Sequence, residues 1–420
     1  MADGDTSARL RSIRLQGFSR ERNPHSRIPL CATSTVAPLM RRALLAVVAL
    51  LAAFAAPVQA SSADSTRTAD PPRVAASAWY LVGEDGAVLA QSSARRERAI
   101  ASITKLMTAI VALEGASLSD VVSVSPRAAG VGESTVYLRA GEELTLAELL
   151  RAMLVRSAND AADAVALHVG KGSMSRFVAQ MNAKARELGL ADTNFENPHG
   201  LDARGHVSSA RDTTVLVRYA LGVPFIRDAL SRSTVSLPGG RVFPTTDDLL
   251  ASWPALVGGK TGHTQDALWS QAAAARAGGV TVYGTVLGSD TRSSRNDALR
   301  ELLAFGLTQY RRITAIDSTR VYALAKTGYG RPSVELVAPR ADVRAVHVGT
   351  SLIERVLAPS SVALPVHKGQ RLGRVEVYDG NRLVASSNLV AAASVAEPGL
   401  VGKARWYATH TAENLWGIIT

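Results

Sequence analysis

A serine and a lysine three residues apart are the first candidates for chemistry in this chain. Ser102 precedes Lys105 within residues 101–109, where apolar residues recur at helical spacing. Residues i and i+3 lie on one face of a helix, so the two side chains are expected to meet. A serine hydroxyl is a weak nucleophile until a neighbouring base removes its proton, and a neutral lysine is such a base. The pair therefore predicts a nucleophilic serine at a helix start, where backbone N–H groups stabilise negative charge.

Two further motifs follow in the chain, Ser157-Ala158-Asn159 and then Lys260-Thr261-Gly262. Each short motif can occur by chance, and a second Lys-Thr-Gly at residues 326–328 illustrates the point. We expect that second copy in a turn because Gly and Pro follow it, whereas an apolar approach to a strand precedes Lys260. The order and spacing of all three motifs therefore predict an acyl-transfer site.

The protonation state of Lys105 decides whether it can act as a base. A free lysine has a pKa of about 10.4, and burial or a second nearby cation lowers that value. We expect both effects at Lys105, with Lys260 as the second cation, so that part of the Lys105 population is neutral.

Four stretches of the sequence resemble the serine-type D-alanyl-D-alanine carboxypeptidases, the low-molecular-mass penicillin-binding proteins of the penicilloyl-serine transferase superfamily. The stretches are residues 101–109, 157–162, 197–201 and 259–264, and the resemblance extends from about residue 75 to residue 306. It implies removal of the terminal D-alanine from peptidoglycan stem pentapeptides through an acyl-serine intermediate, and acylation by β-lactam antibiotics such as penicillins. It implies no cofactor and no metal.

The resemblance also implies roles for five catalytic residues. Ser102 corresponds to the nucleophile and Lys105 to its general base. Ser157 corresponds to a second hydroxyl that relays protons to the leaving group, and Asn159 to the amide that orients the substrate backbone and the base lysine. Lys260 corresponds to the cation that sets the electrostatic field of the cleft.

Substrate-binding roles follow from the same resemblance. Thr261 corresponds to the hydroxyl that binds the terminal carboxylate, and the backbone N–H groups of the nucleophile and of His263 to the oxyanion hole. Gly262 and Thr264 complete this set. Arg295 matches the arginine of the family near the carboxylate pocket.

The sequence departs from the family pattern at two places. Residues 245–250 read Thr-Thr-Asp-Asp-Leu-Leu, whereas the family often has Asn-x-Asn-x-Leu-Leu, so a carboxylate replaces an amide. We interpret these aspartates as solvated loop residues. Residues 266–269, Asp-Ala-Leu-Trp, are bulkier than the small residues that usually follow the Lys-Thr-Gly motif, and we expect substrate preference to differ there.

The elements that position these motifs alternate between strands and helices. Residues 79–82 and 87–91 predict a hairpin, and helical spacing recurs in 146–155, 160–169, 174–188 and 210–221, with Thr145 and Ser208-Ser209 as caps. A second hairpin, 269–275 and 280–288, precedes a helix at 296–307. This order predicts an α+β sandwich with one antiparallel sheet, and it resembles the β-lactamase/transpeptidase-like fold. We assign residues 72–312 to this catalytic DD-peptidase domain.

The hydrophobic pattern of the sequence changes near residue 316. Short alternating segments at 321–324, 334–337, 343–348, 352–356 and 374–378 predict a small all-β C-terminal domain at residues 316–396. Residues 397–420 form a weakly amphipathic tail, for which association with a membrane surface and simple docking or fraying are both open.

The N-terminal residues predict export. A basic start at Met40, an apolar core at residues 43–56 and small residues up to Ala60 are typical of a signal peptide over residues 40–60, with a mature chain starting near Ser61. The alternative is that the apolar core remains as a membrane anchor. Residues 1–39 are polar and arginine-rich, and we interpret them as a disordered extension or as a mis-assigned start, with translation beginning at Met40. The expected location is the periplasm or the extracytoplasmic cell-wall space, and the lone cysteine, Cys31, would be removed.

Composition agrees with an exported globular enzyme. The chain has 420 residues, 47% of them hydrophobic, and a formal net charge of +11. Residues 1–60 contribute +5 of this charge, and the rest of the chain lacks a basic run with interleaved aromatic residues. Nucleic acid is therefore not an expected partner, whereas an anionic wall or membrane surface is.

Other functions on the same fold stay open at this level. A DD-endopeptidase and a class A β-lactamase-like hydrolase are enzymatic alternatives, and an inactive wall-binding homologue is a third. The β-lactamase needs a glutamate to activate the deacylating water, and only Glu196 lies near the expected position, at the wrong spacing. His199, His206 and Asp212 could suggest a metal site or a triad, but we expect these histidines to shape a loop below the cleft.

Overall fold

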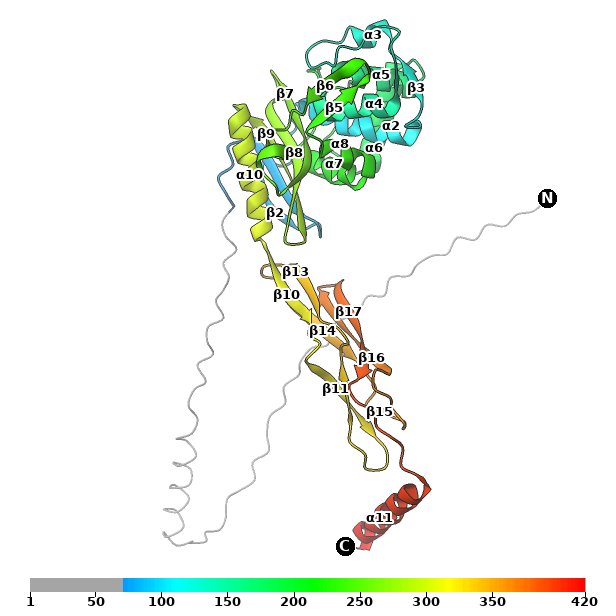
Figure 1. Cartoon of the computed structure of the whole chain (residues 1–420). Coiled ribbons are helices and arrows are strands. Elements are labelled where there is room, and N and C mark those ends of the chain that lie inside the picture. Colours follow the sequence, from blue (N-terminus) through cyan, green and yellow to red (C-terminus); the bar gives the residue numbers. More distant parts are fainter. Residues whose placement is uncertain (1–70, 420) are drawn as a thin grey trace, which may run out of the picture. The chain divides into compact units, whose positions relative to one another are not determined.

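The structure is a computed structural model that describes residues 71–419 (Figure 1). Its N-terminal part is built on a five-stranded antiparallel sheet with the strand order β2-β1-β9-β8-β7. The strands are β1 (Ala78–Gly83), β2 (Val88–Ser92), β7 (Leu256–Thr264), β8 (Leu268–Ala277) and β9 (Val280–Ser289). Strand β7, which carries the Lys-Thr-Gly motif, lies at one edge of this sheet. The two predicted hairpins are confirmed, and both belong to this antiparallel sheet.

A helical region is inserted between strands β2 and β7. Its helices are η2 (Ala101–Thr104), α2 (Lys105–Gly115), α3 (Pro126–Ala129), α4 (Leu146–Arg151), η3 (Ala152–Arg156), α5 (Asn159–Val169), α6 (Met174–Glu187), α7 (Ala210–Gly222), α8 (Pro224–Leu230) and α9 (Leu249–Ser252). Two small hairpins accompany them, β3 (Val121–Ser123) with β4 (Glu143–Thr145), and β5 (Thr234–Leu237) with β6 (Arg241–Pro244).

Side-chain caps fix where several of these helices begin. The Thr145 Oγ1 accepts a hydrogen bond from the Glu148 N–H, and the Thr145 backbone N–H donates to the Glu148 carboxylate, which forms a capping box. Ser209 caps α7 through the N–H of Asp212. The prediction of Thr145 and Ser209 as caps is therefore confirmed. The helix predicted at 296–307 begins earlier, because Thr291 caps α10 (Arg292–Thr308).

The sheet is covered on both faces, as the cartoon in Figure 1 shows. Strand β8 explains how: Ala272 and Ala274 belong to the core shared with the inserted helices, whereas Ala273 and Ala275 belong to the core shared with α10. Successive side chains of a strand point to opposite faces, so a continuous alanine run lets both layers approach closely. The α+β sandwich predicted from the sequence is thus the observed architecture.

The C-terminal part is rich in β-strands. They are β10 (Tyr310–Ile316), β11 (Val321–Thr327), β12 (Val334–Val337), β13 (Asp342–His347), β14 (Leu352–Leu357), β15 (Ser361–Val362), β16 (Arg371–Asp379) and β17 (Arg382–Ala391). Six of them form a sheet of order β14-β16-β17-β12-β11-β15, and β10 pairs with β13. Strand β10 spans the predicted domain boundary, and the sequence did not predict β10, β15 or β17. Lys326 and Thr327 end strand β11 rather than lying in the expected turn, which begins after them.

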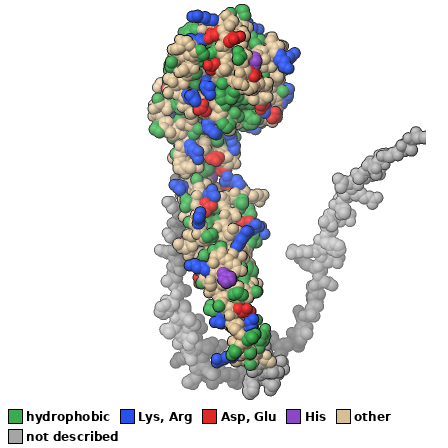
Figure 2. All heavy atoms as spheres, turned by 45° about the vertical axis from the view of Figure 1, so that its right-hand side comes forward, with side chains coloured by type: hydrophobic (Ala, Val, Ile, Leu, Met, Phe, Trp, Pro, Cys, Tyr) green, Lys and Arg blue, Asp and Glu red, His purple; other side chains and the backbone are tan. Residues whose placement is uncertain are grey.

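The predicted tail contains a helix, α11 (Leu400–Ile419). No helix among the described residues is both long enough and apolar enough to cross a membrane. On the face shown in Figure 2, basic side chains are dispersed among acidic and apolar ones. The predicted signal peptide at residues 40–60, the extension at 1–39 and Cys31 lie outside the described residues.

Candidate active site

Ser102 and Lys105 meet as their spacing predicts. Ser102 lies in η2, a single 3-10 turn, and Lys105 is the first residue of α2, so the predicted helix is divided between the two. The Lys105 Nζ lies 2.7 Å from the Ser102 Oγ. A proton can therefore pass directly from the serine to a neutral lysine, without an intervening group.

Lys105 is fully enclosed and surrounded by oxygen atoms. Its Nζ also lies 2.7 Å from the Asn159 Oδ1 and 2.7 Å from the backbone carbonyl oxygen of His199. Burial lowers the pKa of Lys105 well below its ordinary value, and the charge of Lys260 lowers it further. Both effects have the direction that we expected from the sequence. The Asn159 amide and the His199 carbonyl hold the amine against Ser102 in either protonation state.

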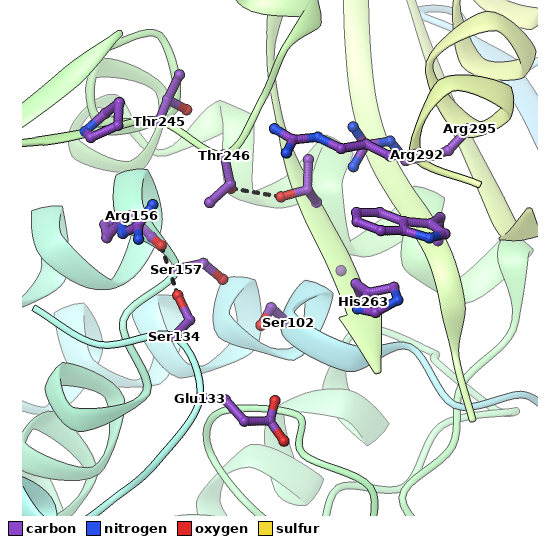
Figure 3. Close-up of a pocket in the computed structure, with 14 residues that line it drawn as sticks. Ser102, Glu133, Ser134, Arg156, Ser157, Thr245, Thr246, His263, Arg292 and Arg295 are labelled. Atoms are coloured by element: carbon purple, nitrogen blue, oxygen red, sulfur yellow. Dashed lines mark hydrogen bonds between the residues drawn. The ribbon is translucent and has the colours of Figure 1, made fainter. Parts of the chain in front are cut away.

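Ser157 and Lys260 form a second hydroxyl–amine pair. The Lys260 Nζ donates to the Ser157 Oγ at 2.9 Å and to the Thr261 carbonyl at 3.0 Å. Burial lowers the pKa of Lys260 to about 7, whereas the charge of Asp247 raises it. Ser157 follows the π-helix η3 and has a left-handed backbone with φ of 68°, a conformation that costs energy outside glycine and clusters at functional sites. That conformation turns its hydroxyl toward the cleft (Figure 3).

The edge strand β7 forms one wall of a cleft that Ser102 and Ser157 also line, together with Thr261, Gly262 and His263 (Figure 3). Gly262 makes the close approach possible: a Cβ at this position would lie 2.7 Å from the Ile100 carbonyl oxygen and 3.2 Å from the Ser102 nitrogen. The His263 ring packs on Trp269, with ring centroids 4.0 Å apart. The bulky residue noted in the sequence is therefore part of the cleft wall.

Thr264 is not placed at the cleft. Its Oγ1 donates to the Asp202 Oδ1 at 2.6 Å and accepts a hydrogen bond from the Ala267 N–H. Its side chain is buried and anchors the end of β7 to the loop that follows residues 197–201. Thr261, in contrast, shares a 2.7 Å hydroxyl contact with Thr246, which also lines the cleft.

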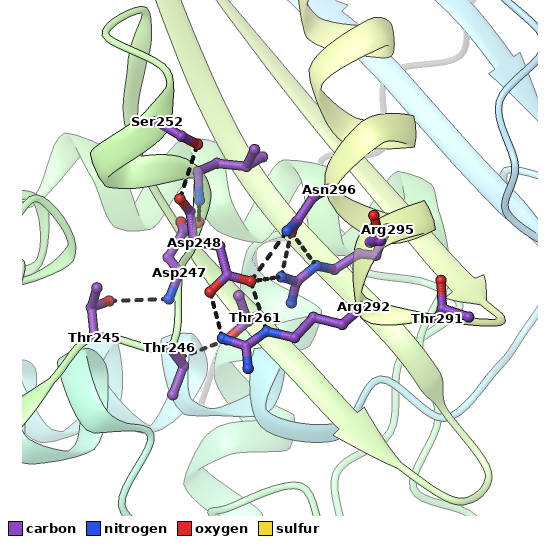
Figure 4. A network of polar contacts seen from close by, with 12 residues as sticks. Thr245, Thr246, Asp247, Asp248, Ser252, Thr261, Thr291, Arg292, Arg295 and Asn296 are labelled. Atoms are coloured by element: carbon purple, nitrogen blue, oxygen red, sulfur yellow. Dashed lines mark hydrogen bonds and ion pairs between the residues drawn. The ribbon is translucent and has the colours of Figure 1, made fainter.

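Two arginines of α10 line the cleft, and the sequence indicated only one. Arg295 is 1% exposed and donates through Nε to the Asn296 Oδ1 at 3.0 Å. Arg292, which was not predicted, is half-exposed and binds Asp248 with two nitrogen atoms, one of them at 2.6 Å. Asp248 also contacts the Arg295 guanidinium at 3.4 Å, so one carboxylate bridges both cations (Figure 4).

The interpretation of both aspartates as solvated loop residues is wrong for Asp247. Its side chain is 3% exposed, its Oδ1 accepts from the Leu249 N–H at 3.1 Å, and its Oδ2 is buried. Burial raises the pKa of this carboxyl, while the Gln271 amide and the Arg295 and Lys260 charges oppose that effect. The turn that precedes α9 brings Asp247 near Lys260 of β7. This proximity depends on tertiary packing, and no local sequence pattern predicts it.

The two loop histidines are neutral structural residues. Burial lowers the pKa of His199 to about 3 and that of His206 to about 4. The His206 ring accepts a hydrogen bond from the Glu196 N–H and contacts the Thr104 Oγ1 at 2.8 Å. Within residues 71–419, no group of three or more His, Cys, Asp or Glu side chains could hold a metal ion. His199 contributes through its backbone carbonyl, and this role leaves no sequence signal.

Comparisons with known proteins agree with the function that the geometry of the site indicates. A family model described as D-alanyl-D-alanine carboxypeptidase matches residues 65–291, more than half of the chain. The chain belongs to this family. D-alanyl-D-alanine carboxypeptidase DacF of Bacillus subtilis is 30% identical over 82% of this chain and 92% of the relative. DacD of Salmonella typhimurium is 30% identical over 89% of this chain and 100% of the relative. Among solved structures, penicillin-binding protein 5 of Haemophilus influenzae is 27% identical, with a TM-score of 0.57 over 78% of this chain and 100% of that chain.

Membership in the carboxypeptidase family extends beyond the catalytic part. The matches to the two relatives span most of both chains, so they include the C-terminal β-rich part. The enzyme is therefore a peptidase hydrolase with the penicillin-binding-protein fold followed by a sheet-rich domain.

Proposed function

We propose that this chain is a serine D-Ala-D-Ala carboxypeptidase that removes the terminal D-alanine from peptidoglycan stem pentapeptides. The observation that carries the proposal is the direct contact of 2.7 Å between the Ser102 Oγ and the Nζ of a buried lysine, Lys105. Family membership supports the substrate class. The catalytic roles of Ser102, Lys105, Ser157, Asn159 and Lys260 are part of the same proposal.

Acylation proceeds by nucleophilic attack. Neutral Lys105 takes the proton of Ser102 while the serine oxygen bonds to the carbonyl carbon of the penultimate D-alanine. The backbone N–H groups of Ser102 and His263 stabilise the resulting oxyanion. The bond from carbon to nitrogen then breaks, and the proton that Lys105 accepted passes through Ser157, which Lys260 holds at 2.9 Å, to the leaving amine of the terminal D-alanine, so that Lys105 is neutral again.

Deacylation reverses these proton movements. A water molecule attacks the acyl-serine ester, Lys105 accepts the proton of that water, and the serine oxygen leaves with the proton returned to it. Penicillins enter the same first step, because their lactam carbonyl takes the place of the peptide carbonyl, and slow hydrolysis leaves the acyl group on Ser102.

The first experiment measures intact mass after the purified chain reacts with a penicillin. We expect one added penicillin on Ser102, no added mass in Ser102→Ala, and the same thermal unfolding for both proteins. A peptide map that locates the label on Ser157 or elsewhere contradicts the assignment.

The second experiment separates the carboxypeptidase from the endopeptidase alternative. A peptide that ends in D-Ala-D-Ala should release free D-alanine, and the same peptide with an amidated C-terminus should be a poorer substrate. The reason is that the donors of the carboxylate pocket lose their anionic partner, at about 1 to 3 kcal/mol for each unpaired buried group. Equal cleavage of both peptides, or cleavage of cross-linked dimers only, favours the endopeptidase. Glu196 does not line the cleft, so the structure offers the β-lactamase alternative no support.

Export and membrane contact belong to this proposal as well. The signal-peptide pattern at residues 40–60 supports export, and N-terminal sequencing of the secreted chain should find Ser61 first. At the tail, exposed Leu400 and Val401 favour a membrane surface, whereas packing of Trp406 on Tyr329 favours docking on the protein. Flotation with phosphatidylglycerol vesicles, with a chain ending at Pro398 as control, decides between the two.

A further inference from the structure

Charged side chains line the cleft on more than one side of Ser102. Arg292 and Arg295 lie beyond Thr246 on one side of Ser102, and Glu133 lies on the other side (Figure 3). Glu133 is exposed, and among the described residues it has no ion pair. Its charge raises the pKa of Lys105, against the larger effect of burial. Arg156 also lines the cleft, near Ser134, and Glu133 is the one carboxylate among the described residues that line it (Figure 3).

Glu133 is held in place by bonds to the residues on both sides of it. The Asn159 Nδ2 donates to the Gly132 carbonyl at 3.0 Å, and the Asn159 N–H donates to the Ser134 carbonyl at 2.7 Å. The Ser134 hydroxyl donates to the Arg156 carbonyl at 3.1 Å. Glu133 itself has a left-handed backbone with φ of 66°. A glutamate is costly in that conformation, so the bonds around it hold its backbone and set the direction of its Cα–Cβ bond.

The residue that follows Asn159 fixes the next part of the same loop. The Asp160 carboxylate accepts hydrogen bonds from the N–H groups of Val136 and Leu138, both at 3.1 Å. The Ser-Ala-Asn motif and its neighbour therefore fasten the whole segment that carries Glu133. The backbone that carries Glu133 is therefore already ordered before a partner binds, and only its side chain loses conformational freedom on binding.

The position of Glu133 corresponds to one part of the substrate. If the terminal carboxylate lies toward Thr261 and the arginines, and the scissile carbonyl lies at Ser102, the remaining peptide must leave on the side of Glu133. One extended residue spans about 3.3 Å, and the first side chain beyond the two D-alanines therefore lies near that rim. A single carboxylate on an ordered backbone, with no ion pair among the described residues, favours a cation at this position.

We propose that Glu133 binds the free ammonium group on the side chain of the residue that precedes D-Ala-D-Ala, so that the enzyme prefers stem peptides with an unacylated diamino acid there. This inference rests on the proposed function and specifies its substrate class. A cross-link that acylates the same amino group removes the charge. The enzyme therefore discriminates against stem peptides that are already joined through this group.

The test compares two peptides that differ only in the side-chain amine, Nα-acetyl-L-Lys-D-Ala-D-Ala and its Nε-acetylated form. D-alanine release gives kcat and KM for each. We expect wild-type kcat/KM to be about three- to fivefold higher for the peptide with the free amine, which is the effect of one partly exposed ion pair. The difference should come from a lower KM for that peptide, with kcat unchanged. Raising the salt concentration from 0.05 to 0.5 M should shrink the ratio.

The variants make the test specific. In Glu133→Gln the ratio of the two kcat/KM values should fall to about 1, and in Glu133→Lys it should fall below 1. Glu143→Gln, which changes an exposed glutamate of β4 outside the cleft, is the matched control and should keep the wild-type ratio. A wild-type ratio of 1, or a ratio that survives in Glu133→Gln, overturns the inference.

Two other outcomes are informative. If Glu133→Gln changes kcat equally for both peptides and leaves their ratio intact, Glu133 acts on Lys105 and does not contact the substrate, which also overturns the inference. If the wild type cleaves neither peptide and penicillin does not label Ser102, the proposed function itself fails. Cleavage of both peptides at equal rates removes only the role of Glu133.

Discussion

Two buried lysines, Lys105 and Lys260, share the cleft and have different surroundings. Lys105 faces the nucleophile and two fixed oxygen atoms, those of Asn159 and of the His199 backbone. Lys260 faces Ser157 and lies within the field of the Asp247 carboxylate. When the surroundings give two groups of the same type different pKa values, the two groups can take different catalytic roles. The arrangement favours a neutral Lys105 as the base beside a Lys260 that titrates near neutral pH.

The coupling between the lysines predicts a shift in pH dependence. The charge of Lys260 lowers the pKa of Lys105, so Lys260→Ala should raise that pKa and move the ascending limb of the acylation-rate profile to higher pH. The rate itself should fall by about 10²-fold, as for loss of one preorganised electrostatic group. Stopped-flow acylation by a penicillin between pH 5 and 10 measures both effects.

The second Lys-Thr-Gly motif supplies the control. Lys326→Ala, at the end of β11, should stay within about a factor of two of wild type, as expected for a change remote from the site. An ascending limb that stays in place in Lys260→Ala removes the coupling from the mechanism. A loss in Lys326→Ala as large as that in Lys260→Ala means that the wrong motif was assigned.

Asp247 predicts a second pH effect. Its charge raises the pKa of Lys260, so Asp247→Asn should lower that pKa and leave less ammonium at pH 7 to attract the terminal carboxylate of the substrate. We expect KM at pH 7 to rise about fivefold and to approach the wild-type value at pH 5.5, where Lys260 is protonated in both proteins. Asp228→Asn, in an exposed ion pair of α8, is the control. Identical KM profiles for Asp247→Asn and wild type exclude this role.

Local spacing predicted the residues whose relation is local. Ser102 and Lys105 are three residues apart, so helical geometry alone brought them together. The burial of Asp247 depends on how α9 packs beside β7, and the contribution of Arg292 on how α10 packs on β8 and β9. A single sequence contains no short-range signal of that packing. The anchoring role of Thr264 was missed for the same reason, because Asp202 reaches it from a distant loop.

At the level of the elements, the edge strand β7 depends on a glycine to reach η2. A Cβ on Gly262 would press on the Ile100 carbonyl and on the Ser102 backbone nitrogen, so Gly262→Ala should push the strand away from the oxyanion hole. A displacement near 1 Å costs about 10²-fold in rate, and we expect penicillin acylation to fall by that order.

Gly328→Ala is the matched control, because Gly328 ends the second Lys-Thr-Gly motif and a Cβ there meets no atom within 4 Å. Thermal unfolding of both variants monitors the fold. Wild-type acylation by Gly262→Ala refutes the close-approach argument.

The predicted elements were most reliable where the hydrophobic period was long. Helices α5, α6 and α7 and the strands of the second hairpin were all anticipated from periodicity. The π-helix η3 was predicted as a simple continuation of α4, because its residues have the same apolar spacing. Its ending, with Ser157 in a left-handed conformation, depends on tertiary contacts such as that of Asn159 with Ser134.

For the whole molecule, a functional cleft with a buried cation has a cost in stability. Lys260 has a folded pKa of about 7 against an ordinary 10.5, so between these values the unfolded chain binds more protons than the folded one. The unfolding free energy therefore rises with pH across this window. The full penalty is present below pH 7, and it disappears as the pH rises through 10.5.

Lys260→Met removes the penalty while keeping a flexible side chain of similar length in the same space. We expect this variant to unfold at a higher temperature than wild type at pH 7, by several degrees for a gain of a few kcal/mol, and to lose the advantage near pH 10. Calorimetry at both pH values measures the difference, and loss of penicillin acylation shows that activity is exchanged for stability. Lys326→Met, in the C-terminal strand β11, should leave the unfolding temperature of the catalytic part unchanged at either pH. A Lys260→Met protein less stable than wild type at pH 7 means that the bond of Lys260 to Ser157 outweighs the cost of burying the charge.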